Sequence, residues 1–496
     1  MTPAAASSPG AVHVSARGWG WRHAGRKAFA ARHLDLDIRP GERVLLLGAS
    51  GAGKSTVLHA LAGVLGGNGE GEQEGELLLD GRQPAAARGR AGLVLQDPET
   101  QVVLARVGDE VAFAAENLSV PREEIWQRVE RALDDVGLDL PLDHPTTALS
   151  GGQKQRLALA SVLAMEPGLL LLDEPTANLD PDGVLEVRDA VVRVLERTGA
   201  TLVVVEHRVA VWADVVDRVI VLDAGGGVLA DGPPAVVLTR EDTRRRLAAA
   251  GVWVPGVQPR LGGTVPSGGG DVLLSACGLT VARTKRGPVA VRDLGLEVTA
   301  AQSLSITGPN GAGKSTAALT LGGLLRPRSG RLEASAELAG AAGGDPFRWR
   351  SPQLVQRIGT VFQEPEHQFL TASVEEELEF GPRRVAATID TARISEVAER
   401  LRLTHLLKAN PFTLSGGEKR RLSVATMLAT APRILILDEP TFGQDALTWA
   451  ELVTLLRELI DDGVAVLSVT HDAEFIAALG GDRLHISAGA GRLVSR

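Results

Sequence analysis

Two glycine-rich stretches, at residues 48–56 and 308–316, end in Gly-Lys-Ser-Thr. Each follows a short strand-like run, VLLLG or SLSIT, and this context predicts a strand, a loop and then a helix. Glycines let the backbone wrap around an anion, and a helix N-terminus attracts phosphate. The pattern predicts two phosphate-binding loops, formed by Gly48, Ala49, Ser50, Gly51, Ala52, Gly53, Lys54, Ser55 and Thr56, and by Gly308, Pro309, Asn310, Gly311, Ala312, Gly313, Lys314, Ser315 and Thr316.

Within these loops the lysine and the following serine have distinct expected tasks. Lys54 and Lys314 are expected to reach the terminal phosphates of a nucleotide. The hydroxyls of Ser55 and Ser315 are expected to ligate Mg²⁺. A glycine-rich turn with an exposed lysine is the structural alternative, and two full matches in the same context make it the weaker one.

A second pair of stretches, GLLLLDEP and RILILDEP, carries carboxylates at the end of an apolar run. Such a run predicts a strand buried on both faces of a parallel sheet, whose carboxyl end is where ligands bind. Asp173 and Asp438 therefore fit a Mg²⁺ shell. Glu174 and Glu439 are placed to orient and deprotonate an attacking water.

The motifs recur in one order, which indicates a duplicated domain. Gly-Lys-Ser-Thr, Leu-Ser-Gly-Gly, Asp-Glu-Pro-Thr and a later His all return after 260 to 265 residues. We expect one domain at 11–250 and a second at 272–496. The segment 251–271 is rich in Gly, Pro and Ser and predicts a flexible linker, and residues 1–10 are expected to be disordered.

Composition narrows the class of protein. The chain has 496 residues, 44% of them apolar, and a net charge of −9, which argues against nucleic acid as the main partner. Its one cysteine, Cys277, excludes an internal disulfide framework and a four-cysteine zinc site, and favours a reducing compartment. Without a signal peptide or an 18-residue apolar run, we expect a chain that does not cross a membrane itself.

LSGGQKQRLALA and LSGGEKRRLSVA each begin with a capping box that starts a helix. Capping explains Ser150 and Ser415, but not the two glycines that follow each of them, because glycine near a helix start costs up to about 1 kcal/mol relative to Ala. Bare N–H groups at a helix N-terminus are useful where an anion must come close. With these motifs in place, the chain resembles a tandem ATP-binding cassette (ABC) protein over nearly its whole length.

The resemblance implies an α/β fold with two tandem P-loop NTPase ABC domains, each a RecA-like mixed sheet core with an antiparallel β subdomain and a helical subdomain. It implies ATP and Mg²⁺ as cofactors, and an intramolecular head-to-tail pairing in which each ATP lies between the phosphate loop of one domain and the Ser-Gly-Gly of the other. One site then joins the first loop, Gln96, Asp173, Glu174 and His207 with Ser415, Gly416 and Gly417; the other joins the second loop, Gln363, Asp438, Glu439 and His471 with Ser150, Gly151 and Gly152.

Further roles follow from the same resemblance. Gln96 and Gln363 are expected to contact the metal and the attacking water, and His207 and His471 the γ-phosphate. Asp180 and Asp445 fall where the family's D-loop lies, the second in FGQD rather than the commoner pattern with Leu. Trp21 is the aromatic ring expected to stack on adenine in the first half, with Trp19 or a packing role as alternatives. The second half lacks an aromatic there, so aliphatic or Arg contacts are expected.

QDPETQ and QEPEHQ carry a second Gln that a generic cassette does not need. Together with the apolar pair that follows, the pattern resembles the Q-helix of energy-coupling factor (ECF) transporter ATPases, beside the surface that meets the membrane T component. Gln101 and Gln368 are therefore expected to couple to that partner, unless they are only solvated helix starts.

We expect the ATPase of an ECF-type importer, bound on the cytoplasmic face of a bacterial membrane to separate T and S components, with a vitamin or a transition-metal ion as cargo. The alternatives are a tandem sugar-importer ATPase, whose second site is often degraded, and a translation-type cassette protein, which usually carries a long charged helical arm between its halves. Neither feature is seen in this sequence.

Overall fold

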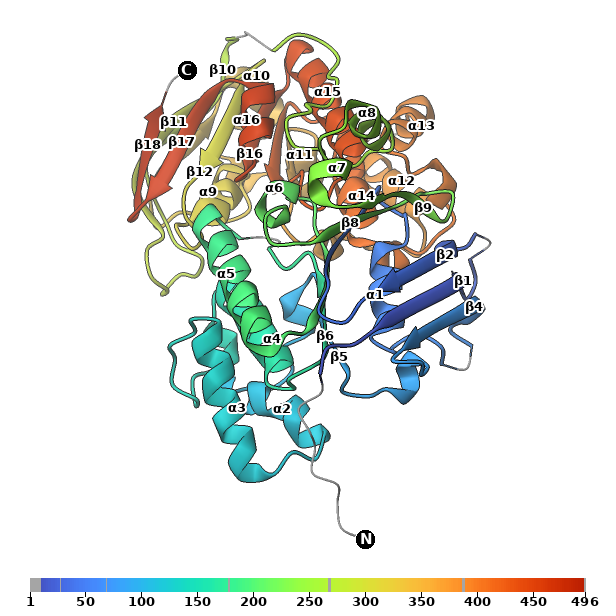
Figure 1. The fold of residues 1–496 in the computed structure, drawn as a ribbon. Coiled ribbons are helices and arrows are strands. Elements are labelled where there is room, and N and C mark those ends of the chain that lie inside the picture. Colours follow the sequence, from blue (N-terminus) through green and yellow to red (C-terminus); the bar gives the residue numbers. More distant parts are fainter. Residues whose placement is uncertain are drawn as a thin grey trace. The chain divides into compact units, whose positions relative to one another are not determined.

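The computed structural model describes residues 10–26, 28–67, 69–176, 179–265, 269–385 and 389–494. Most of the N-terminus expected to be disordered, and residues 266–268 of the expected linker, lie outside the described residues. The chain divides into two compact units between Gln258 and Pro259 (Figure 1). Each unit combines antiparallel strands, mainly parallel strands and helices, so each has the α/β architecture that the sequence predicts.

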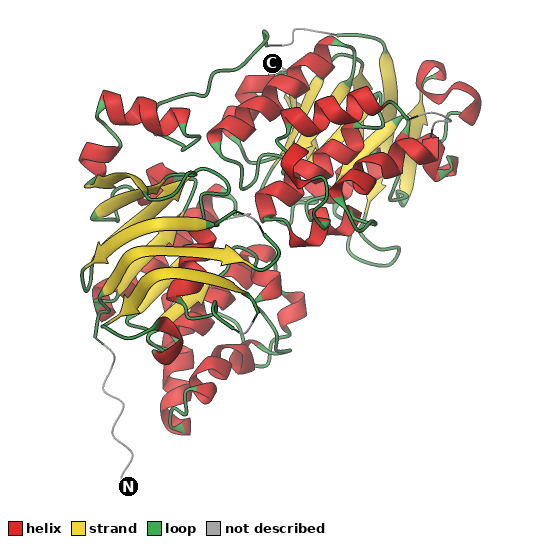
Figure 2. Cartoon of the chain, turned by 90° about the vertical axis from the view of Figure 1, so that its right-hand side faces the viewer, coloured by secondary structure: helices red, strands yellow, loops and turns green. Residues whose placement is uncertain are grey.

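The first unit contains two sheets. Strands β2-β1-β4 form an antiparallel sheet, and β5-β6-β7-β3-β8-β9 form a second sheet that is parallel except for β9. The long strands of the antiparallel sheet lie side by side as a curved layer (Figure 2). The strands are β1 (Val14–His23), β2 (Ala31–Ile38), β3 (Arg43–Gly48), β4 (Gly71–Leu79), β5 (Ala91–Val94), β6 (Leu169–Asp173), β7 (Thr201–Val205), β8 (Arg218–Leu222) and β9 (Val228–Gly232).

The helices of the first unit cover this framework. Helices α2, α3 and α4 pack on one another as a helical subdomain, and α1 follows β3 directly (Figure 1). The helices are α1 (Lys54–Leu61), α2 (Val107–Asn117), α3 (Arg122–Asp135), α4 (Gly151–Leu163), α5 (Pro181–Thr198), α6 (Val209–Trp212), α7 (Pro234–Val237) and α8 (Glu241–Ala249).

The second unit repeats the design with one continuous sheet, in the order β13-β10-β11-β18-β17-β12-β16-β15-β14. A single parallel pair, Arg292 with Ala490, joins its antiparallel and parallel parts. The elements are β10 (Val272–Val281), β11 (Val291–Thr299), β12 (Ser303–Thr307), β13 (Ser329–Ala334), β14 (Ile358–Val361), β15 (Ile434–Asp438), β16 (Ala465–Val469), β17 (Asp482–Ser487), β18 (Ala490–Val494), α9 (Lys314–Leu321), α10 (Ala336–Ala339), α11 (Ser351–Val355), α12 (Val374–Val385), α13 (Thr391–Arg400), α14 (Gly416–Leu428), α15 (Ala446–Asp461) and α16 (Ala473–Leu479).

Strand β3 shows how the sequence builds two cores around one sheet. Val44 and Leu46 belong to the core under the antiparallel sheet, whereas Leu45 and Leu47 belong to the core under the helices. Successive side chains of a strand point to opposite faces, so an uninterrupted apolar run is needed where both faces are covered. The two cores fix the ends of β3 and β6, where the predicted site residues lie.

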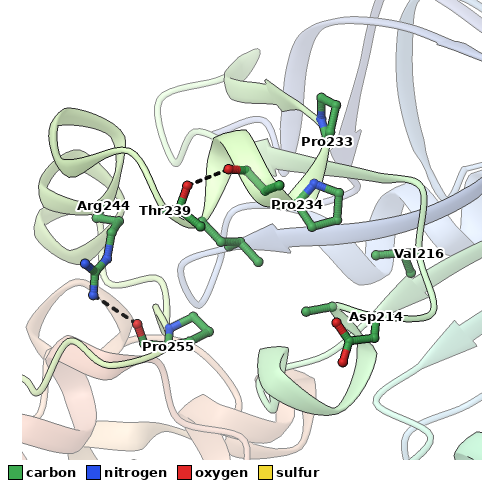
Figure 3. A pocket seen from close by; sticks show the side chains of 10 residues that line it. Asp214, Val216, Pro233, Pro234, Thr239, Arg244 and Pro255 are labelled. Atoms are coloured by element: carbon green, nitrogen blue, oxygen red, sulfur yellow. Dashed lines mark hydrogen bonds between the residues drawn. The ribbon is translucent and has the colours of Figure 1, made fainter.

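Part of the segment expected to be a flexible linker packs on the first unit. Val252 and Val254 are buried in its core. Arg244 of α8 donates from Nη2 to the carbonyl of Pro255, at 3.1 Å (Figure 3). Ordered contacts therefore continue past residue 250, and the predicted domain boundaries stay a prediction.

Candidate functional site

Each phosphate-binding loop joins a buried strand to a helix, β3 to α1 and β12 to α9. The residue before each helix, Gly53 or Gly313, has a left-handed backbone, with φ of 86° and 99°. A Cβ at residue 53 would stand 2.2 Å from the carbonyl oxygen of Ala30, so only glycine fits this close approach. The sequence thus forces a tight loop at a helix start, where an anion can bind.

The two lysines fold back over their own loops. Nζ of Lys54 lies 2.9 Å from the carbonyl oxygen of Gly48 and 3.0 Å from that of Ala49. Nζ of Lys314 lies 2.9 Å from the carbonyl oxygen of Gly308 and donates to the next residue as well. Burial lowers the pKa of Lys54, although the carboxylates of the site oppose that shift. Both ammonium groups are held where the phosphates of a nucleotide would enter.

The first carboxylate of each pair ends a fully buried strand, β6 or β15, and accepts a hydrogen bond from the loop serine. Asp173 is bonded to Ser55, and Asp438 to Ser315. Burial, with Glu174 next to it, raises the pKa of Asp173 to about 6, and burial also raises the pKa of Asp438. A carboxylate and a hydroxyl that meet at the phosphate loop are an oxygen donor set that fits Mg²⁺.

The following glutamates have the same strained backbone but different partners. Glu174 and Glu439 both have φ of 48°, which is uncommon for a residue with a side chain and is typical of functional sites. Glu174 accepts from Nε2 of Gln96 at 2.8 Å, and its Oε1 lies 3.2 Å from Nε2 of His207. Burial pushes the pKa of Glu174 upward, but His207, Lys54 and Gln96 outweigh it and hold that pKa below its ordinary value.

In the second half the corresponding contacts are looser. Glu439 lies 3.9 Å from His471, whose Nε2 is instead 3.2 Å from Oδ1 of Asn310. Burial, and then the charge of Asp438, raise the pKa of Glu439 to about 7. In the nucleotide-free chain, the two candidate bases therefore differ in protonation near neutral pH, although their sequence motifs are alike.

This difference predicts opposite effects of two matched substitutions on the stability of the chain without metal or nucleotide. The pKa of Glu439 in the folded chain, about 7, lies above its ordinary value of 4.5, so stability is lost as pH rises from about 4.5 to 7. Glu439→Gln removes that loss and should raise the free energy of unfolding at pH 8, by on the order of 2 to 3 kcal/mol. At pH 4 it should have little effect.

Glu174→Gln is the control, because the pKa of Glu174 is lowered and its ionised form stabilises the fold above its ordinary pKa. It should lower the free energy of unfolding at pH 8. Urea unfolding of both variants in EDTA, at pH 4 and pH 8, measures the effect. Equal changes in the free energy of unfolding of the two variants at pH 8 would contradict the opposite pKa directions assigned to Glu439 and Glu174.

The Ser-Gly-Gly motifs begin α4 and α14 as the capping boxes expected. Ser150 and Ser415 each accept from the backbone N–H three residues on, and the side chain of that residue accepts in return. Both serines are exposed, and a Cβ at Gly151 would meet nothing within 4 Å. Internal packing therefore does not require glycine there, and the head-to-tail pairing of these motifs with the other half's phosphate loop stays a prediction.

Asp180 and Asp445 lie at the starts of α5 and α15, the helices that follow β6 and β15 in the chain. Asp180 caps α5, since its Oδ1 accepts from the N–H of Gly183 at 2.9 Å. Asp445 stands directly before α15. Both positions are helix-terminal, and their assignment to the family's D-loop stays a prediction.

The structure corrects the prediction for Trp21. Trp21 is 2% exposed and Trp19 is 0% exposed, and both belong to the core under the antiparallel sheet. A ring enclosed in this way has no free face for adenine. His23, two residues on and half-buried, lies beside the phosphate loop, with Nε2 3.4 Å from Oγ1 of Thr56.

His23 is the ring that the sequence reasoning missed. Trp21 donates from Nε1 to Nδ1 of His23 at 3.2 Å, and the rings are edge to face with centroids 6.2 Å apart. Burial and then Arg26 lower the pKa of His23, so its imidazole is neutral at pH 7. Strand alternation would have pointed to this residue, because positions 21 and 23 share one face. In the second half Val281 is equivalent to Trp21. The exposed Arg283 stands there at the position that His23 has in the first half.

A second residue that the sequence analysis missed lies beside His207. Glu206 is 4% exposed at the end of β7, and it accepts from the N–H groups of Thr176, His207 and Arg208 at 3.0, 3.0 and 3.3 Å. Burial raises the pKa of Glu206. Its signal in the sequence was a carboxylate directly before the histidine.

Gln101 and Gln368, the residues expected to couple to a partner, make hydrogen bonds within the chain. Both carboxamides are half-buried and bond to the backbone of the strand that precedes them in the chain. Each carboxamide keeps a second N–H donor beyond these bonds, and its coupling to a partner stays a prediction.

One sizeable cavity lies away from this site. It has a volume of about 640 Å³ and is lined by segments around α6, β8, α7 and α8, with Asp214, Val216, Thr239 and Arg244 among its side chains (Figure 3). The residues lining it include none of the predicted site residues. Cavity size therefore does not locate the chemistry in this chain.

Comparison with known proteins agrees with the fold. The ABC transporter family matches residues 31–177 and 291–442. "Putative HMP/thiamine import ATP-binding protein YkoD" of Bacillus subtilis (strain 168) is 35% identical over 473 residues, which cover 90% of this chain and 84% of that protein. "Putative ABC transporter ATP-binding protein" of Methanosarcina acetivorans is 33% identical over 511 residues, covering 91% and 80%.

A solved complex of archaeal ribosomal stalk protein aP1 with the ribosome recycling factor aABCE1 has a chain with the same fold, with a TM-score of 0.60 and 20% identity, covering 99% of this chain and 90% of that one. The chain belongs to the ABC transporter family, whose ATP-binding proteins are ATPases. More particularly, it is a tandem ATPase with one cassette in each half. Among the described residues, no helix has the length and hydrophobicity required to cross a bilayer.

Proposed function

We propose that the chain is the ATP-hydrolysing subunit of an ECF-type importer, bound through separate T and S components to the cytoplasmic face of a bacterial membrane. The observation that supports a partner surface is a matched pair of exposed apolar side chains. Val103 is 65% exposed and Leu370 is 68% exposed, and each stands two residues after the second Gln of its Q stretch. Exposed apolar groups repeated in both halves fit a protein contact.

Relatives that match along nine tenths of the chain support transport over other uses of the fold. YkoD is named for HMP/thiamine import, which favours a vitamin or vitamin precursor as cargo over a transition-metal ion. The likeness to aABCE1, at 20% identity, reflects the fold alone. The second half keeps Lys314, Asp438 and Glu439 around its loop, which argues against a tandem sugar importer with a degraded second site.

Each residue of the first site has a proposed role in hydrolysis. Lys54 and the loop amides bind the terminal phosphates, Gln96 orients the attacking water, and Glu174 takes its proton while His207 lies beside them. Mg²⁺ bound at Ser55 and Asp173 would neutralise charge on the phosphates. In the first site His23, rather than Trp21, is proposed to stack on adenine.

The first experiment identifies the partners. The tagged full-length chain, purified from detergent-solubilised membranes of its own cells, should bring down proteins with membrane spans, and deleting them should abolish ATP-dependent uptake of a radiolabelled vitamin such as thiamine. Co-sedimentation with ribosomes, without membrane proteins, would instead support a translation role.

The second experiment tests the surface. Val103→Glu with Leu370→Glu should remove assembly with those membrane proteins, because a charge replaces an apolar contact worth about 1.5 to 3 kcal/mol per side chain. ATPase activity of the isolated chain should stay within about twofold of wild type. Val236→Glu, which changes another exposed valine (43% exposed) in α7, is the matched control and should assemble normally. Normal assembly of the double variant would reject this surface.

A further inference from the structure

The second Gln of each Q stretch makes the same pair of hydrogen bonds in both halves. Oε1 of Gln101 accepts from the N–H of Leu95 at 3.0 Å, and its Nε2 donates to the carbonyl of Leu93 at 3.1 Å. Oε1 of Gln368 accepts from the N–H of Phe362 at 2.9 Å, and its Nε2 donates to the carbonyl of Thr360 at 3.2 Å. We call each of these arrangements a carboxamide clamp.

The clamps lie on the outermost strands of the parallel sheets. Strands β5 and β14 each end their sheet, and an edge strand has a row of N–H and C=O groups with no neighbouring strand. Alternate residues of a strand direct these groups to the same side, which is why one carboxamide reaches residues 93 and 95, or 360 and 362. A carboxamide offers one acceptor and two donors, so it replaces a residue of the missing strand.

Each clamp closes the base of the loop that carries the first Gln. Leu95 directly precedes Gln96, and Gln96 donates to Oε2 of Glu174 at 2.8 Å. The bond from Gln101 to the N–H of Leu95 therefore fixes where the strand ends and where Gln96 begins. Pro98 lies in the short 3-10 turn between them, and its fixed φ keeps the loop stiff.

In the second half the clamp is also tied to α14. Ser423, which is 0% exposed in α14, donates from Oγ to Oε1 of Gln368. Arg420 of the same helix donates from Nη1 to the carbonyl of Phe362 at 3.3 Å and to that of Asp438 at 3.3 Å. The residue before Gln363 is thus held at both its N–H and its carbonyl group.

The first half lacks these extra ties among its described residues. Ala158 and Gln155 stand 265 residues before Ser423 and Arg420, the offset that relates the two Ser-Gly-Gly motifs. Gln155 is 1% exposed, and neither polar atom of its side chain has a hydrogen-bond partner in the described part of the chain. Both halves share the pair of hydrogen bonds of the clamp, whereas among the described residues only the second half links its clamp to the helix that follows Ser-Gly-Gly.

We infer that Gln101 and Gln368 are positioning residues for ATP hydrolysis, which hold Gln96 and Gln363 at the reacting centre by pairing with the outer side of β5 and β14. Neither contacts the nucleotide itself. The inference concerns the ATPase reaction and does not depend on which membrane partner the chain serves.

The experiment uses the purified full-length chain and steady-state ATPase kinetics. Gln101→Ala with Gln368→Ala should lower kcat about 10- to 100-fold, because a misplacement of about 1 Å at a catalytic group costs about 10²-fold. KM for ATP should change less than about threefold, since the phosphate loops are untouched. His367→Ala, on the exposed side of the same turn, is the control and should keep wild-type kcat.

A pH profile separates positioning from simple loss of packing. In Gln101→Glu with Gln368→Glu, an ionised carboxylate cannot donate to the carbonyls of Leu93 and Thr360, whereas the neutral acid again offers one donor and one acceptor. The ratio of variant to wild-type kcat should therefore rise several-fold from pH 8 to pH 6. The Ala variants should show a constant ratio. A Glu variant whose ratio does not change with pH, or an Ala variant with wild-type kcat, would overturn the inference.

Ser423→Ala tests the link that is specific to the second half. It leaves the bonds of Gln368 to the strand in place, so kcat should fall less than in Gln368→Ala alone. A larger fall than in Gln368→Ala would show that α14, and not the strand edge, is what holds the loop.

Discussion

Replacing Glu174 and Glu439 together by Gln should slow ATP hydrolysis by about 10² to 10⁴, the usual contribution of a positioned general base. Glutamine keeps the size of the side chain but does not accept the proton of the attacking water. Each single variant should also turn over slowly, because each half has its own loop lysine, serine and aspartate around the base. ATP binding, measured with a fluorescent analogue, should persist in all three variants.

The control for these variants is Glu186→Gln in α5, which removes an exposed carboxylate that pairs with Arg156 at the surface. It should hydrolyse ATP at the wild-type rate. Wild-type turnover in one of the two single variants would mean that its site is structural and that the other half carries the activity.

Trp21→Ala should destabilise the first unit by about 3 to 5 kcal/mol, because a buried Trp leaves a large cavity when it is truncated to Ala. The physical reason is the packing of this ring in the core under the antiparallel sheet. Urea unfolding followed by circular dichroism measures the loss, and Trp21→Phe should recover most of the stability.

His23→Ala is the matched variant on the same strand face, and the opposite pattern is expected for it. It should weaken ATP binding at the first site by about 1 kcal/mol, the scale of an aromatic contact, and should leave stability within about 1 kcal/mol of wild type. The affinity is measured with the second site disabled by Lys314→Ala. If Trp21→Ala were as stable as wild type but bound ATP poorly, the original assignment of adenine to Trp21 would be restored.

The proposed transport function and the proposed positioning role of the carboxamide clamps can be rejected independently. Loss of membrane assembly in the Val103 and Leu370 variant concerns the exposed surface, whereas the clamp variants are measured on the isolated chain. If the clamp variants lose kcat as expected but the chain binds ribosomes and no membrane proteins, the positioning role is supported and the importer function is rejected.

The sequence by itself determined the chemistry that is written in contiguous residues. A strand, a glycine turn and Lys54 follow one another in the chain, so local sterics and hydrogen bonding decide their arrangement. The same holds for the apolar run that ends at Asp173, and for the capping box at Ser150. These motifs, and their return in a second copy, were enough to predict two ABC-type α/β units.

Tertiary structure decided everything that depends on which distant segments meet. Strand alternation places Trp21 and His23 on one face, but only burial under the antiparallel sheet decides that His23 is the one beside the phosphate loop. Gln96 and Glu174 are 78 residues apart and meet because β5 and β6 pair side by side. The pKa difference between Glu174 and Glu439 likewise arises from packing around similar motifs. Burial and the charge of Asp438 raise the pKa of Glu439, whereas His207, Lys54 and Gln96 lower that of Glu174. Motifs fix which groups are present, whereas packing sets the distances between them, and these distances govern hydrogen bonding and charge.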